Sequence, residues 1–79
     1  MFAVYLIQSI THPTQTYIGF SSDLKARLNA HNSGKSIHTN KFKHWKLVSC
    51  TFFSDKKRAL DYESYLKSHS GRAFRKKHF

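Results

Sequence analysis

The stretch that decides the fold is SDKKRALDYESYLKS, which runs from Ser54 to Ser68. Its apolar residues recur every three to four positions, and this spacing predicts an amphipathic helix packed on the core. Ser54 or Asp55 is expected to be the N-cap, because both residue types accept hydrogen bonds from the first turn. The stripe expected to face inward is Ala59, Tyr62, Glu63 and Leu66.

Glu63 stands out because it places a carboxylate within this inward stripe. Burying a charge costs several kcal/mol unless a cation or hydrogen-bond donors meet it. The other three acids have simpler explanations: Asp23 and Asp55 lie at expected helix N-termini, where negative charge is favoured, and Asp61 projects to the opposite side. The simplest interpretation of Glu63 is a pair with Lys67 four residues later, which contributes a few tenths of a kcal/mol.

Length and composition predict a single small domain over residues 1–79. The one cysteine cannot form an internal disulfide and no secretory leader is evident, so we expect a reducing, cytoplasmic compartment. The longest apolar run, residues 2–7, is too short to span a bilayer.

Positive charge dominates the composition, since 14 Lys and Arg residues face four acids and give a net charge of +10. Such a field attracts polyanions, and nucleic acid is the first candidate because phosphate neutralisation dominates that kind of affinity. An anionic membrane is a weaker candidate, because no segment combines a basic face with a bulky apolar one. A structural protein bound to RNA is a further alternative on charge alone.

Three segments rich in β-branched and aromatic residues predict strands at 2–8, 15–20 and 45–53. Pro13 marks a turn between the first two, which are therefore expected to pair as an antiparallel hairpin. Gly19, near the end of the second strand, indicates a bulge or a close backbone approach.

A helix is predicted from Asp23 to about His31, with Ser22 as the preferred N-cap and Gly34 available for a left-handed terminus. Its inward stripe contains Arg27 and His31 beside two leucines. We expect both polar groups at the edge of a cleft, although long basic side chains also reach water past apolar surface.

Residues 35–44 are polar and basic without periodicity, and they predict a surface loop suited to contact with a nucleic-acid strand, or simply a solvated run of charge. The tail after Gly71 predicts a short basic helix. The order strand, strand, helix, strand, helix, helix predicts an α+β fold with a three-stranded antiparallel sheet flanked by helices. The expected nucleic-acid-binding residues are Lys35, Lys41, Lys43, Arg72 and Lys76.

Several motifs together resemble the GIY-YIG nuclease superfamily, closest to its small stand-alone bacterial members. The tripeptides AVY, ending at Tyr5, and YIG, beginning at Tyr17, match its paired signature. The helix with Arg27 and His31 resembles its Arg-x-x-x-His/Tyr element, and Glu63 falls where the family keeps a metal-binding glutamate.

The resemblance implies a divalent-metal-dependent endonuclease that hydrolyses phosphodiester bonds in DNA, with RNA as an alternative substrate. Glu63 would bind Mg²⁺ or Mn²⁺, an ion that needs only one or two protein carboxylates. Arg27 would stabilise charge on the phosphate, and Tyr17 would be the general base, its phenolate favoured by nearby positive charge. His31 would relay the proton or hold Tyr17, and Tyr5 would orient the phosphate or the water network.

The sequence departs from the family pattern at Ala3, where the signature has glycine; one extra methyl on a strand should require only slight repacking. The DNA-binding or partner domains of larger members are not evident. The resemblance suggests a role in DNA repair or recombination and a cytoplasmic location, associated with the nucleoid when on DNA; no protein partner is implied. The alternative is a basic nucleic-acid-binding module without turnover.

Overall fold

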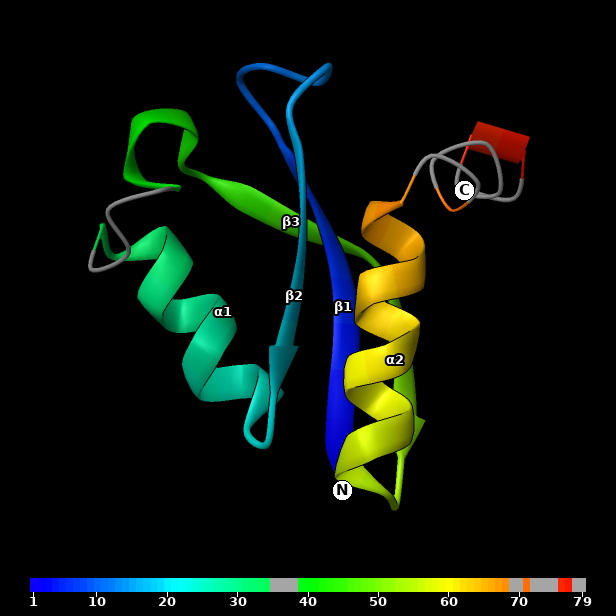
Figure 1. Cartoon of the computed structure of the whole chain (residues 1–79). Helices are drawn as coiled ribbons and strands as arrows, with labels where there is room; N and C mark the ends of the chain where they lie inside the picture. Colours follow the sequence, from blue (N-terminus) through cyan, green and yellow to red (C-terminus); the bar gives the residue numbers. More distant parts are fainter. Residues whose placement is uncertain (35–38, 69–70, 72–75, 78–79) are drawn as a thin grey trace.

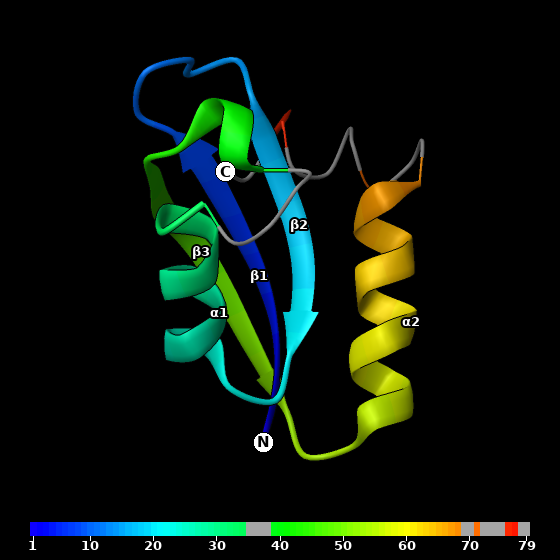
Figure 2. The same cartoon turned by 90° about the vertical axis from the view of Figure 1, so that its left-hand side faces the viewer.

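The computed structural model describes residues 1–34, 39–68, 71 and 76–77. It contains an antiparallel sheet of strand order β2-β1-β3 between two helices (Figures 1 and 2), which confirms the predicted α+β class. The predicted last helix falls mostly on residues outside the described part; of the described residues beyond Ser68, Gly71 and 76–77 are helical. The elements are β1 (Phe2–Ser9), β2 (Thr16–Ser21), α1 (Leu24–Asn32), the 3₁₀ turn η1 (Asn40–Phe42), β3 (Trp45–Phe53) and α2 (Lys56–Lys67).

The central strand β1 is buried on both faces, because α1 covers one face of the sheet and α2 the other (Figure 1). Alternate side chains of a strand point to opposite faces. Val4 and Leu6 therefore pack toward α2, while Tyr5 and Ile7 pack with the residues of the α1 side. A continuous apolar run such as 2–7 is what a strand buried on both faces requires.

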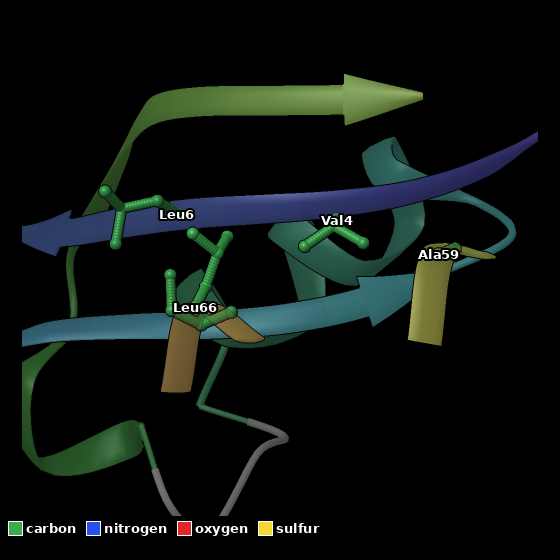
Figure 3. Packing of buried hydrophobic residues seen from close by; sticks show 5 residues of the cluster. Val4, Leu6, Ala59 and Leu66 are labelled. Atoms are coloured by element: carbon green, nitrogen blue, oxygen red, sulfur yellow. The ribbon is translucent and has the colours of Figure 1, made fainter. Parts of the chain in front are cut away.

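On the α2 side, Ala59 and Leu66 of the helix pack against Val4, Leu6 and Ile18 of the sheet (Figure 3). The predicted stripe is confirmed, since Ala59 and Leu66 are buried and Glu63 is partly buried. On the α1 side the buried residues are Tyr5, Ile7 and Trp45, with Tyr17, Leu24, Leu28, Phe42 and Cys50 packed against them.

Both helices begin at an aspartate. Asp23 accepts a hydrogen bond from the backbone of Ala26 at 3.1 Å and is the N-cap of α1, so the preference for Ser22 was wrong. The Ser21 hydroxyl bonds the backbone N–H of Asp23 at 2.9 Å instead, which holds the cap in place. Gly34 has φ of 80°, which confirms the predicted left-handed residue after α1.

Gly19 marks a close approach and not a bulge. It pairs with Tyr5 across the hairpin, and a Cβ at position 19 would overlap the Tyr5 hydroxyl and ring. The irregularity in the sheet lies elsewhere, between Leu6 and Ile7 in the pairing of β1 with β3. The glycine therefore provides the space in which the Tyr5 phenol lies.

Substitution Gly19→Ala is expected to lower the free energy of unfolding by about 1–3 kcal/mol, because the added methyl forces the Tyr5 ring out of its place. Chemical denaturation monitored by circular dichroism measures this. Thr16→Ala, at an exposed position of the same strand, is the matched control and should change stability by about 0.5 kcal/mol or less. Equal stability of Gly19→Ala and the wild type would contradict the packing described above.

Within the described part of the chain, neither helix is both long enough and apolar enough to cross a bilayer.

Candidate active site

A chain of hydrogen bonds lies buried between the sheet and α1. The Tyr5 hydroxyl, on β1, is 2.8 Å from His31 Nε2, on α1. His31 Nδ1 is 2.6 Å from the hydroxyl of Thr39, which precedes η1. All three residues are at most 1% exposed. Both ring nitrogens of the histidine are therefore satisfied inside the protein, as buried polar groups require.

Backbone contacts hold the far end of this chain. The indole N–H of Trp45 donates to the Thr39 carbonyl at 2.9 Å. The Asn32 side chain, at the end of α1, accepts from the Trp45 backbone N–H at 2.6 Å and donates to its carbonyl at 3.1 Å. The prediction of a solvated surface loop is thus wrong at Thr39, which belongs to the interior; residues 35–38 lie outside the described part.

Burial sets the protonation state of the two titratable members of the chain. Desolvation raises the pKa of Tyr5, and the hydrogen-bonding Arg27 side chain opposes this only in part. Desolvation also lowers the pKa of His31, with the positive charge of Arg27 acting in the same direction. At neutral pH the pair is therefore a neutral phenol and a neutral imidazole.

Arg27 joins the buried chain to the surface. It is exposed on α1, and its positive charge lies close enough to lower the pKa of His31 and to oppose the raised pKa of Tyr5. A neutral imidazole donates from one ring nitrogen and accepts at the other, so the bonds to Tyr5 and Thr39 use the two nitrogens in opposite roles.

Tyr17 lies above the chain at the rim of the site. Its half-buried ring is 6.4 Å from the Tyr5 ring and 5.1 Å from the His31 ring, centroid to centroid. Tyr17 and Tyr5 come to the same face because Tyr17 pairs with Ile7, two residues along β1 from Tyr5. The expected hydrogen bond from His31 to Tyr17 is wrong: His31 bonds Tyr5 and Thr39 and meets Tyr17 through ring contact.

Glu63 reaches the same place from α2. Its side chain is 19% exposed, and Oε2 is 3.4 Å from the Lys67 ammonium, the simple pairing expected from the sequence. The Lys67 ammonium in turn lies 5.9 Å from the centroid of the Tyr17 ring. The Glu63 charge is also close enough to contribute to the raised pKa of Tyr5. Glu63 therefore pairs with Lys67, and its charge is near enough to act on Tyr5.

Of the five residues expected to form the site, Tyr5, Tyr17 and His31 are in ring contact, and the charges of Arg27 and Glu63 lie near enough to act on Tyr5. The five fall into two layers. Tyr5 and His31 are the buried layer, and Tyr17, Arg27 and Glu63 are the layer that faces outward. The sequence interpretation missed Thr39, for which an aperiodic loop has no signal, and saw Lys67 only as a helix neighbour. Of the expected nucleic-acid-binding residues, Lys41, Lys43 and Lys76 are exposed, while Lys35 and Arg72 lie outside the described part.

The donor set fits a hard divalent cation bound mostly by water and phosphate. No cluster of three or more His, Cys, Asp or Glu residues occurs among the described residues, which argues against a closed, all-protein metal cage there. Mg²⁺ needs only one or two carboxylates. The Glu63 side chain is partly exposed and its partner Lys67 is half-exposed, so a cation from solvent can reach the carboxylate.

The buried imidazole makes the protein sensitive to acid. Because the pKa of His31 is lower in the folded than in the unfolded chain, the unfolded state binds more protons in the window between the two values. The neutral, buried His31 therefore contributes its full stabilisation above about pH 6.5. As the pH falls from there through the lower pKa of the folded state, the free energy of unfolding decreases by at most about 1.4 kcal/mol per pH unit. Unfolding by denaturant at several pH values measures it. His31→Gln should remove this component of the slope, whereas His12→Gln, at an exposed position, should retain it; identical slopes in all three proteins would contradict the assignment.

Comparison with known proteins agrees with this geometry. A family model described as the GIY-YIG catalytic domain matches residues 1–77. A search of curated proteins finds no match.

Proposed function

Because the chain belongs to the GIY-YIG catalytic domain family, a family of nucleases, we propose that it is a divalent-metal-dependent endonuclease that hydrolyses phosphodiester bonds in DNA. One observation carries the proposal: Tyr17 packs on the rings of a buried Tyr5–His31–Thr39 chain, and the charges of Arg27 and Glu63, from two other elements, act on that chain. Cations, a proton acceptor and a carboxylate in one place are what phosphodiester hydrolysis requires.

Arg27 is the proposed phosphate-binding residue. Its exposed side chain is available to a substrate, and its planar fork of donors matches phosphoryl oxygens. Negative charge grows on these oxygens as water attacks, so a fixed guanidinium stabilises the transition state more than the ground state.

Tyr17 is the proposed general base. Its half-buried ring is held between the His31 ring and the Lys67 ammonium. Its phenol oxygen would accept a proton from the attacking water while the water oxygen bonds to phosphorus. The phosphodiester bond to the leaving oxygen breaks in the same displacement.

Tyr5 and His31 are proposed as positioning residues. At 1% and 0% exposure they are covered by protein, so direct contact of Tyr5 with phosphate or its water, as expected from the sequence, is not favoured. Their hydrogen bond instead fixes the two rings against which Tyr17 packs. Tyr5 and His31 would thereby hold Tyr17 in place without touching the reacting atoms.

Glu63 would hold the divalent cation, Mg²⁺ or Mn²⁺. When bound, the ion would supply Lewis-acid stabilisation of charge on the phosphate and the leaving oxygen. Glu63 itself keeps a negative charge at the rim of an otherwise basic site, and Lys67 balances it. We further propose a cytoplasmic, nucleoid-associated protein that acts in repair or recombination, as the family resemblance suggests.

A cleavage assay tests the proposal directly. Purified protein is incubated with labelled nicked, branched, duplex and single-stranded DNA, and with matched RNA, in Mg²⁺, in Mn²⁺ and in EDTA. Cleavage that depends on the metal is expected. Salt-sensitive binding without cleavage under either metal would instead support the alternative, a basic binding module that retains the fold without turnover.

A further inference from the structure

A second exposed surface lies where the β1–β2 hairpin loop meets η1 (Figures 1 and 2). The two segments are joined by backbone contacts: the Ile10 N–H donates to the His44 carbonyl at 2.9 Å, and the Ser9 hydroxyl donates to the Phe42 carbonyl at 2.7 Å. Ser9 is fully buried, so this junction is part of the folded interior. We call it the hairpin–η1 surface, formed by Ile10, His12, Lys41, Phe42 and Lys43.

His12 is an exposed aromatic ring whose orientation is set by three contacts. Its Nδ1 is 3.0 Å from the Thr11 hydroxyl, and its ring meets the Phe42 ring edge-to-face, with centroids 5.1 Å apart. Its backbone N–H also donates to the buried Ser9 hydroxyl at 3.0 Å. A ring that is exposed and yet already oriented loses little entropy when a flat ligand stacks on it.

Apolar and cationic residues are also exposed on the two segments that form this surface. Ile10 is 59% exposed, and Lys41 and Lys43 are exposed. The Lys41 ammonium lies 5.6 Å from the centroid of its neighbour Phe42. Rings, an aliphatic side chain and cations on one surface match the chemistry of unpaired nucleotides, which present a base face beside a phosphate.

An intact duplex fits this surface less well. Its base faces are stacked inside the helix, so only phosphates and groove edges are available to the protein. The lysines of the surface would then be sufficient for binding. The exposed Ile10 and His12 would then gain no partner. A second copy of the chain is also disfavoured, because each carries a net charge of +10.

The surface is linked to the proposed active site through the buried Thr39. The Phe42 N–H donates to the Thr39 carbonyl at 3.2 Å, and the hydroxyl of the same Thr39 is hydrogen-bonded to His31. One 3₁₀ turn therefore separates the two. We propose that the hairpin–η1 surface binds a single-stranded segment of DNA adjacent to the cleaved bond, with His12 as a stacking platform; as a statement about cleavage, this rests on the proposed function.

The binding test needs no cleavage. A fluorescein-labelled oligothymidine of about 15 nucleotides and a blunt duplex of equal length are titrated in EDTA and followed by anisotropy. At about pH 8.5, where an ordinary imidazole is neutral, His12→Ala is expected to weaken single-strand binding at least about fivefold, the lower end of the stacking effect. Duplex affinity should change less than about twofold.

Two comparisons separate stacking from charge. The slope of log Kd against log salt should stay unchanged in His12→Ala, whereas Lys41→Ala should reduce it by about 0.7, the value for one phosphate contact on a single strand. His12→Trp should retain or strengthen single-strand binding, because a larger ring preserves the stacking. Phe52→Ala, which removes an aromatic that is 55% exposed on β3, is the matched control and should bind as the wild type does.

The proposal is overturned if His12→Ala weakens single-strand and duplex binding equally, if His12→Trp behaves as His12→Ala, or if Phe52→Ala has the same effect. Its failure is distinguishable from failure of the proposed function. A protein that binds single strands through His12 but cleaves nothing would retain this inference and lose the nuclease. A protein that cleaves DNA but whose single-strand binding does not depend on His12 would retain the proposed nuclease function and lose this inference.

Discussion

Replacing Glu63 with glutamine is expected to lower the rate of metal-dependent DNA cleavage by about a thousandfold or more. The change keeps the shape of the side chain but removes the charge that would hold the cation, and charge stabilisation by such an ion is worth several kcal/mol. Single-turnover cleavage measures the rate, and calorimetric titration of Mn²⁺ into the protein without DNA measures cation binding independently. Glu63→Gln should lose both cleavage and Mn²⁺ binding.

The fold should survive this change. The Glu63–Lys67 contact is an i,i+4 pair that contributes a few tenths of a kcal/mol, so the free energy of unfolding should change by less than about 0.5 kcal/mol. Asp61→Asn, an exposed acid on the same helix, is the control and should retain full activity. Undiminished cleavage by Glu63→Gln would show that the site is assigned wrongly, and a loss of several kcal/mol in stability would indicate a structural role.

Replacing Tyr17 with phenylalanine is expected to reduce cleavage about 100- to 10,000-fold, the range for loss of a general base. The phenylalanine ring retains the contacts with Tyr5, His31 and Lys67, so only the proton acceptor is removed. The informative measurement is the pH profile of the single-turnover rate. The wild-type profile should contain an ionisation that Tyr17→Phe lacks.

Tyr62→Phe provides the control for loss of a hydroxyl, because Tyr62 packs on the opposite face of the sheet, beside Phe53. It should cleave at the wild-type rate. Tyr17→Phe should bind uncleaved DNA in EDTA with unchanged affinity, since the residue is proposed to act in the chemical step. If its binding falls as much as its cleavage, Tyr17 serves substrate binding and the base lies elsewhere.

The outcome of these variants also separates the two interpretations of the fold. In a non-catalytic binding module, neither Glu63 nor Tyr17 has a special role, and both variants would bind DNA as the wild type does with no cleavage to lose. A nuclease loses turnover while retaining binding. The buried chain beneath the site should be intact in both variants, because neither residue donates to or accepts from it.

The repeating patterns of the sequence determined the elements of this fold. Three apolar and aromatic runs became the three strands, and the bounds of β3 are those predicted. The helical spacing around Glu63 identified which face of α2 is buried. Such patterns are readable because the period of a helix or strand is a local property of the backbone. The family resemblance then predicted five site residues, of which the structure places Tyr5, Tyr17 and His31 in ring contact.

Only the tertiary structure decided how these residues divide their roles. Thr39 follows no periodic pattern, and it became part of the interior because the indole of Trp45 and the ring of His31 both bond to it. The two ring nitrogens of His31 form hydrogen bonds with Tyr5 and Thr39, so neither is available to Tyr17, which lies half-buried at the rim. Contacts between side chains far apart in the chain depend on packing, which local periodicity does not encode.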